Sequence, residues 1–337
     1  MTSSAQAHID LSKLRRVLIV KPSSLGDIVH TLPALHDLKT TFPRLEIKWL
    51  ANTEWLPLLE GHPQLNGTLE FPRGELGGVK RLWPAMRWML DLHRQYQPDV
   101  TLDFQGLFRS GLISWFSHSR KRLGLTDARE GARYFHNFHV VVDPSSHAVD
   151  RYRCMGAALG TDTSLPAVFN LPRGNSLARS LPPNYVAFHP FSRGEGKSLT
   201  VSQVSDFCQR VERPVVLLGR LDPLERAQLR LPDSTLDLLN QTTIPELITC
   251  LRRAAATISV DSGPMHLATA LNPEGTLAIH TWSDPRKVGP YSPNSWVLKG
   301  GQIHECARLT ADICENSQGF SDSEVDQLIT WAHQRVS

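Results

Sequence analysis

The sequence contains no apolar run of about eighteen residues, so it predicts no membrane-spanning helix. Residues 1–13 are polar and lack the apolar stretch of a signal peptide. The five cysteines are dispersed along the chain, and no two of them form a Cys-x-x-Cys pair. An odd, dispersed set of cysteines is typical of reduced thiols, so we expect a cytoplasmic protein without a disulfide framework.

Several nucleotide-binding and metal-binding motifs are also absent. No Gly-x-Gly-x-x-Gly follows the first apolar strand, which disfavours a dinucleotide-dependent dehydrogenase. The tripeptide Gly196-Lys197-Ser198 matches the end of a phosphate-binding loop, but Phe191 stands where that motif requires its first glycine. A P-loop NTPase is therefore kept only as an alternative. The fourteen histidines include no pair at His-x-x-x-His spacing, so we predict no metal site.

The net charge of +3 is too small to indicate bulk binding of nucleic acid. The charge is unevenly distributed, because residues 73–133 contain eleven lysines and arginines against six aspartates and glutamates. A basic sector of this kind suits an anionic substrate or an anionic membrane surface. An ordinary solvated surface is the alternative interpretation.

Apolar strands alternate with helical segments along both halves of the chain. Strands are predicted at residues 14–20, 45–50, 69–72, 100–104, 120–124 and 136–142, and again at 185–189, 215–219, 236–239, 256–260 and 275–280. We expect residues 120–124 to form an edge strand. The alternation predicts an α/β protein with two doubly wound, Rossmann-like halves that face one cleft.

The domain boundaries follow from composition and spacing. Residues 1–170 are predicted to form the N-terminal domain, and the proline-rich segment 171–183 to form a linker. Residues 184–318 are expected to form the second domain. Within residues 319–337, the serines at 321 and 323 and Glu324 give the start signal of a last helix.

One turn at the end of the first strand combines several polar side chains. It reads Lys21-Pro22-Ser23-Ser24-Leu25-Gly26-Asp27 and joins the apolar run 17–20 to a helix predicted over 28–40. The carboxyl ends of strands in such sheets face the ligand crevice, where Asp27 would supply a carboxylate base. Ser24 and Asp27 are also typical helix caps, so the pattern alone leaves both roles open.

Three turns of the second half follow predicted strands in the same way, and their loops are expected to converge on one crevice. Their side chains and amides suit diphosphate oxygens and sugar hydroxyls. The residues are Ser192, Arg193 and Lys197 in the first turn, Glu225 in the second, and Asp261, Ser262, Gly263 and His266 in the third. Taken singly, each is equally consistent with a surface charge or a helix cap.

Four stretches together resemble glycosyltransferase family 9, the lipopolysaccharide heptosyltransferases, in matching order over about residues 15–295. They are residues 21–35 with the turn described above, Asp103-Phe104-Gln105-Gly106-Leu107-Phe108-Arg109-Ser110, Ala128-Arg129-Glu130 with His147-Ala148-Val149-Asp150-Arg151, and Val260-Asp261-Ser262-Gly263-Pro264-Met265-His266 with Ser283-Asp284-Pro285. The third of these stretches, residues 128–130 with 147–151, is similar to the heptosyltransferase I branch. The resemblance implies a GT-B fold whose last helix, within residues 319–337, packs back on the N-terminal domain.

The resemblance also implies an activity and roles for residues. Members transfer a heptose from ADP-heptose to the Kdo region of a lipid A precursor, with inversion and without an essential metal or cofactor. The resemblance implies that Asp27 is the catalytic base and that Lys197 stabilises the leaving diphosphate. It also implies that the residues of the three turns bind the donor. The implied acceptor-binding residues are Ser23, Ser24, Gly26, Lys80, Arg81, Gln105, Arg109 and Arg129. The enzyme would work as a peripheral protein at the inner face of the cytoplasmic membrane. A different nucleotide sugar or acceptor, or a non-catalytic binding protein on this fold, are the alternatives.

Overall fold

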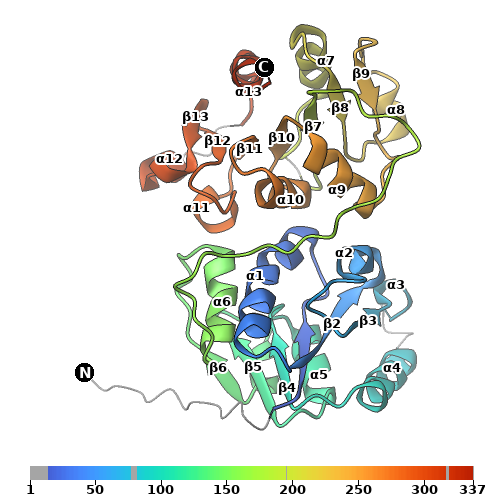
Figure 1. Ribbon diagram of the computed structural model, residues 1–337, viewed down its shortest axis with the longest axis vertical. Helices are drawn as coiled ribbons and strands as arrows, with labels where there is room; N and C mark the ends of the chain where they lie inside the picture. Colours follow the sequence, from blue (N-terminus) through green and yellow to red (C-terminus); the bar gives the residue numbers. More distant parts are fainter. Residues whose placement is uncertain (1–13, 77–81, 195, 316–318, 337) are drawn as a thin grey trace. The chain divides into compact units, whose positions relative to one another are not determined.

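The computed structural model describes residues 14–76, 82–194, 196–315 and 319–336. The chain divides into two compact units, Met1–Pro172 and Arg173–Ser337 (Figure 1). The division falls inside residues 171–183, which were expected to form the linker between two domains. Residues 173–175 already belong to the second unit, because the Asn175 amide donates to the carbonyl of Pro245.

The N-terminal unit is built on a six-stranded parallel sheet of order β3-β2-β1-β4-β5-β6. Its strands are β1 (Arg16–Val20), β2 (Glu46–Asn52), β3 (Gly67–Phe71), β4 (Val100–Asp103), β5 (Lys121–Leu125) and β6 (Phe138–Val140). The apolar run 17–20 is buried because β1 lies in the middle of the sheet, as expected for a strand covered on both faces. Strand β5 was predicted at the sheet edge, but it pairs with β4 and β6, so β6 is the edge strand.

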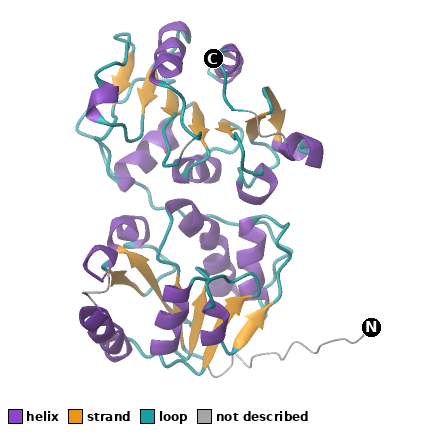
Figure 2. Ribbon diagram, turned by 180° about the vertical axis from the view of Figure 1, so that it is seen from behind, coloured by secondary structure: helices purple, strands orange, loops and turns teal. Residues whose placement is uncertain are grey.

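Helices cover both faces of this sheet (Figures 1 and 2). They are α1 (Leu25–Thr41), α2 (Leu56–Leu59), α3 (Arg73–Leu76), α4 (Leu82–Gln95), α5 (Phe108–Phe116) and α6 (Ala148–Ala157). Helices α1 and α6 pack against each other, and the ion pair between Arg153 and Asp37 joins them. On the other face, Leu92 of α4 and Ile113 of α5 lie in one apolar cluster with Leu18.

The C-terminal unit repeats the arrangement with seven strands, in the order β13-β12-β11-β10-β7-β8-β9. They are β7 (Val186–His189), β8 (Val215–Leu217), β9 (Thr235–Asp237), β10 (Ala256–Val260), β11 (Thr276–Ile279), β12 (Trp296–Lys299) and β13 (Gln302–Glu305). All neighbours pair in parallel except β12 and β13, which pair antiparallel. The helices are α7 (Val201–Arg210), α8 (Pro223–Arg226), α9 (Ile244–Arg253), α10 (Gly263–Leu271), α11 (Pro285–Val288), α12 (Ala311–Glu315) and α13 (Ser323–Arg335). The elements from α11 to α12 were not predicted from the sequence.

The last helix, α13, packs within the C-terminal unit. It contacts α7, β10 and β13, and Val325, Leu328 and Trp331 are buried in the core of that unit. This helix buries its apolar face within its own unit, where that face finds apolar partners. That residues 319–337 also pack back on the N-terminal domain stays a prediction. Within the described ranges, no helix is long and apolar enough to cross a membrane.

Candidate functional site

Asp27 lies in the first turn of α1, directly after the carboxyl end of β1. The Ser24 amide and hydroxyl donate to Asp27 Oδ2 at 3.1 and 2.8 Å. The Tyr152 hydroxyl donates to Oδ1 at 3.1 Å, and the Lys21 ammonium lies 3.5 Å from the same oxygen. Asp27 therefore caps the helix through one oxygen while its other oxygen lies in a polar cluster.

The Asp27 cluster holds the carboxylate in its charged form. Burial raises the pKa of Asp27, but the Lys21 ammonium and the hydrogen bonds from Ser24 and Tyr152 outweigh it and bring the pKa below 3.8. The Asp27 side chain nevertheless keeps 37% of its surface exposed. An ionised, accessible carboxylate can accept a proton from a bound hydroxyl at neutral pH.

A polar cavity of about 350 Å³ borders this cluster at Tyr152. It is also lined by Gln105, Arg129, Arg151 and Asp127. Gln105, Asp127 and Arg129 meet because β4 pairs with β5, which brings the loops after both strands together. Strand β1 pairs with β4 on its other side, so the loops after β1 and β4 also lie side by side. The predicted residues of these two loops are in contact, since the amide of residue 23 donates to Gln105 Oε1 at 3.2 Å.

The structure brings only some of the predicted acceptor residues to this cavity. Gly26 is buried in the first turn of α1. Arg109 is not among the residues that line the cavity in the described chain, and its guanidinium lies 5.9 Å from the centre of the Phe71 ring. Lys80 and Arg81 lie outside the described residues.

Sequence reasoning missed three residues of this site. Lys21 is 2% exposed and Tyr152 is 6% exposed, and neither was predicted as a site residue. Asp103 is fully buried and accepts hydrogen bonds from the amides of Gln105 and Gly106, so it fixes the turn that presents Gln105. Lys21 and Asp103 stand inside the motifs that carried the resemblance, whereas Tyr152 left no signal.

In the C-terminal unit, Lys197 and Asp261 form the centre of a second cluster. The Lys197 ammonium lies 2.6 Å from Asp261 Oδ2, and the Ser283 hydroxyl donates to the same oxygen at 2.8 Å. The Ser192 hydroxyl donates to the Asp261 carbonyl at 3.3 Å. These residues lie in the loops after β7, β10 and β11. The loops meet because β10 pairs with both β7 and β11, so the carboxyl ends of the three strands lie together.

The electrostatics of the Lys197–Asp261 cluster favour a charged Asp261 carboxylate beside a neutral histidine. Burial raises the pKa of Asp261, but His280, Lys197 and Ser283 bring it below 3.8. Burial lowers the pKa of His280 to about 4, so this imidazole is neutral at physiological pH. The Lys197 ammonium also lies 4.6 Å from the centre of the Trp282 ring.

The remaining predicted donor residues lie around this cluster or away from it. Ser262 precedes α10, and its hydroxyl lies 3.4 Å from His189 Nδ1. Gly263 and His266 lie in the first turns of α10, and His266 is buried. Arg193 follows Ser192 and is exposed to solvent.

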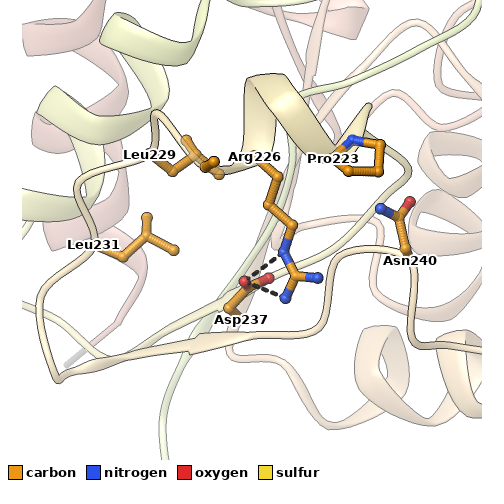
Figure 3. A pocket seen from close by; sticks show the side chains of 7 residues that line it. Pro223, Arg226, Leu229, Leu231, Asp237 and Asn240 are labelled. Carbon is orange, nitrogen blue, oxygen red and sulfur yellow. Dashed lines mark hydrogen bonds and ion pairs between the residues drawn. The ribbon is translucent and has the colours of Figure 1, made fainter.

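Glu225 is exposed on α8, one residue before Arg226. Arg226 points toward Asp237, and the two residues, whose ion pair measures 2.6 Å, line a surface cavity of about 500 Å³ (Figure 3). Glu225 is not among the residues that line this cavity in the described part of the chain. The structure thus places Glu225 at the surface without joining it to the Lys197–Asp261 cluster.

No group of three or more histidine, cysteine, aspartate or glutamate side chains in the described ranges is arranged to hold a metal ion. The five cysteines are all free thiols.

Comparison with known proteins identifies the family. Glycosyltransferase family 9 (heptosyltransferase) matches residues 91–312. A curated relative is lipopolysaccharide heptosyltransferase 1 of Pseudomonas aeruginosa, which is 28% identical over 331 residues, 93% of this chain and 91% of the relative.

Solved structures show the fold. The Escherichia coli heptosyltransferase WaaC, solved with ADP, is similar with a TM-score of 0.71 at 20% identity, over 94% of this chain and 99% of that one. The iron-containing dodecameric glycosyltransferase TibC of enterotoxigenic E. coli gives a TM-score of 0.56 at 16% identity, over 96% and 77%. The predicted α/β class of the GT-B type is confirmed by the two sheets, which are parallel except for the β12–β13 pair, and by the likeness to WaaC. The match over residues 91–312 includes strands β4 to β6 of the first sheet and all strands of the second, more than half of the chain, and on that evidence the chain belongs to glycosyltransferase family 9.

Proposed function

We propose that this chain transfers a heptose from ADP-heptose to the Kdo region of a lipid A precursor in lipopolysaccharide core assembly. The proposal includes inversion at the anomeric carbon and no essential metal. Family membership and the similarity to lipopolysaccharide heptosyltransferase 1 support it. The observation that carries it is the Asp27 carboxylate, which is ionised, partly exposed and next to a polar cavity that contains arginines.

In this reaction, the acceptor hydroxyl oxygen forms a bond to the anomeric carbon of heptose as the bond from that carbon to ADP breaks. Asp27 takes the hydroxyl proton as the new bond forms. Attack from the face opposite ADP inverts the configuration at carbon. The protonated Asp27 afterwards returns its proton to water through its exposed surface.

The terminal phosphate of the leaving ADP gains one negative charge as the bond breaks. In the proposed site Lys197 and Ser192 lie beside the diphosphate, together with the amides that open α10 at Ser262 and Gly263. Fixed donors of this kind stabilise developing charge without the need to reorganise. His266 would contact the phosphates, and Arg193 and Glu225, both exposed, would bind outer parts of the nucleotide or sugar.

The acceptor would enter at the cavity beside Tyr152. Kdo carries a carboxylate, and arginine binds carboxylates with two parallel hydrogen bonds. Arg129 lines the cavity, and Arg151 is held there by an ion pair with Asp127. Ser23, Ser24 and Gln105 would bind acceptor hydroxyls around Asp27.

A lipid-linked acceptor requires contact with a membrane, and we propose that α4 provides it at the inner face of the cytoplasmic membrane. Trp83, Met86 and Leu90 are 83%, 41% and 49% exposed and recur at helical spacing along one stripe. Arg87 and Arg94 are exposed among them. Apolar side chains with interspersed arginines suit the interface of an anionic bilayer.

The first test is thermal unfolding of the purified protein with ADP, UDP, GDP and ADP-heptose. A ligand that binds only the folded state raises the unfolding temperature. Stabilisation by ADP and ADP-heptose, but by neither UDP nor GDP, is expected. Stabilisation by UDP or GDP alone would point to another nucleotide sugar and overturn the donor assignment.

The second test is transfer itself, measured as heptosylated Kdo-lipid A with and without a chelator. We expect turnover that EDTA does not reduce. Donor binding without any turnover would favour a non-catalytic protein on the same fold, and loss of turnover in EDTA would reject metal independence.

A further inference from the structure

We propose that Tyr152 and Lys21 are positioning residues that fix the orientation and the charge of Asp27; this rests on the proposed role of Asp27 as the base. Neither side chain needs to touch the substrates for this. Both act through Asp27, to which they come from different elements, since Lys21 follows β1 and Tyr152 lies on α6.

The direction of the hydrogen bonds can be worked out from the donors present. A lysine ammonium only donates, so Lys21 Nζ donates to the Phe104 carbonyl and to the Tyr152 oxygen, each at 3.0 Å. The single phenolic hydrogen of Tyr152 is then free to point to Asp27 Oδ1, 3.1 Å away. The result is a chain that runs from a cation through a neutral phenol to a carboxylate.

The protonation states agree with this chain. Burial lowers the pKa of Lys21, but Tyr152 and Asp27 outweigh it, so the pKa lies above 10.5 and the ammonium stays charged. Burial raises the pKa of Tyr152, which keeps the phenol neutral. A buried ammonium is stable only when its donors are satisfied, and Tyr152 is one of the groups that satisfy it.

The arrangement leaves Asp27 both fixed and able to react. Ser24 donates twice to Oδ2 and Tyr152 donates once to Oδ1, so both oxygens are held and the carboxylate cannot rotate freely. A carboxylate offers about four acceptor positions, so a position remains on Oδ1 for an acceptor hydroxyl. Tyr152 also lines the polar cavity, and it therefore links the proposed acceptor site to the base.

Other charged and titratable groups lie around Lys21, Tyr152 and Asp27. Asp103 at the end of β4 acts on Lys21, and Arg151 of α6 acts on Tyr152. The His30 ring on α1 packs edge-on against the ring of His147, and the two ring centres lie 5.2 Å apart. His147 caps α6. The Arg153–Asp37 ion pair, both side chains 5% exposed, fixes α6 on α1 and so holds Tyr152 at its place.

The test compares Tyr152→Phe with Tyr96→Phe. Tyr96 is a matched control, since its hydroxyl is also hydrogen-bonded inside the same unit, to the carbonyls of Val17 and Glu46. Tyr152→Phe removes a hydrogen bond that favours the ionised carboxylate, so the pKa of Asp27 rises. We expect kcat to fall about tenfold while the KM for ADP-heptose stays constant. The acidic limb of the pH profile moves up by about one pH unit.

Two outcomes overturn the proposal. One is a Tyr152→Phe profile that coincides with the unsubstituted enzyme; the other is an equal loss of kcat in both phenylalanine variants with no change in either profile. Lys21→Gln is the second variant, and it should raise the pKa of Asp27 further than Tyr152→Phe because it removes the charge.

A measurement without substrates separates this proposal from the proposed function. The pKa of the Asp27 carboxyl can be followed by carbon NMR in the free protein, with Asp27→Asn to assign the signal. A rise in Tyr152→Phe but not in Tyr96→Phe supports the positioning role even if the protein transfers no heptose. An unchanged pKa in Tyr152→Phe overturns the role even if heptose transfer is found.

Discussion

Replacing Lys197 by methionine tests the centre of the proposed donor site. The ammonium lies 2.6 Å from Asp261 Oδ2, and the side chains of this pair are 20% and 11% exposed. Methionine keeps most of the apolar length of lysine but leaves Asp261 without its cation. The Ser283 hydroxyl at 2.8 Å remains as a neutral partner.

The cost in stability follows from how far the pair is buried. Breaking a fully buried ion pair costs about 3–5 kcal/mol, and a fully exposed one about 0–1 kcal/mol. The pair between Lys197 and Asp261 lies between these limits, so we expect a loss of about 1–3 kcal/mol. For a unit of this size the unfolding temperature falls by about 2–12 °C.

The pH dependence has a definite sign. The folded protein lowers the pKa of Asp261, so the pair stabilises the fold above the unfolded pKa, and this contribution is lost as the pH falls through the folded pKa. The difference in the free energy of unfolding between Lys197→Met and the unsubstituted protein should therefore have its full size at pH 7. It should shrink below about pH 4, because Asp261 is then increasingly protonated in both proteins.

The assay is a double-mutant cycle of Lys197→Met and Asp261→Asn, read by urea unfolding, together with calorimetry of ADP binding. The cycle should show a coupling larger than about 0.5 kcal/mol, and Lys197→Met should weaken ADP binding about 10- to 100-fold. Arg210→Met is the control, because Arg210 pairs in the same unit with Asp206 and Asp326, and the three side chains are 49%, 43% and 64% exposed. It should leave the unfolding temperature and ADP binding unchanged. Additive single variants with unaltered ADP affinity would refute the reasoning.

Three further predictions concern the N-terminal unit. Asp27→Asn should lower kcat by about 10²- to 10⁴-fold and leave the Kd of ADP unchanged, measured by steady-state kinetics and calorimetry; weaker ADP binding with preserved kcat would contradict the base assignment. Arg153→Met should destabilise the unit by about 3–5 kcal/mol in urea unfolding, since it leaves the Asp37 carboxylate, 5% exposed, buried without its cation. A loss below about 1 kcal/mol would show that the packing of α1 on α6 does not depend on this ion pair. Replacing Trp83 and Leu90 by serine should reduce sedimentation with vesicles that contain phosphatidylglycerol, while turnover of a soluble acceptor stays constant, and unchanged sedimentation would reject α4 as the membrane-binding face.

Much of the architecture was predictable because the signal is local. A continuous apolar run such as residues 17–20 indicates a strand buried on both faces, and it lies in the middle of its sheet. The turn that ends in Asp27, and the turn that begins at Asp261, lie at the carboxyl ends of β1 and β10 as expected. The short strands β12 and β13 have no such continuous apolar run in the sequence. They form by pairing, β12 with β11 and β13 with β12.

The final helix shows the limit of this kind of inference. Residues 323–335 have a helix-start signal and an amphipathic pattern, and the helix is present. A pattern states which residues face apolar surroundings, but it does not name the surface that covers them. The structure places Leu328 and Trp331 in the core of the C-terminal unit.

The sequence by itself determined the α/β class, the repeated alternation of strands and helices and the polar turns at strand ends, because these depend on local spacing and backbone preference. Only the tertiary structure decided which side chains from distant parts of the chain act on Asp27. Tyr152 lies 125 residues away in sequence, and it reaches Asp27 because α6 packs against α1. The charge of a carboxylate depends on every group within a few ångströms in three dimensions, and spacing along the chain does not contain that information.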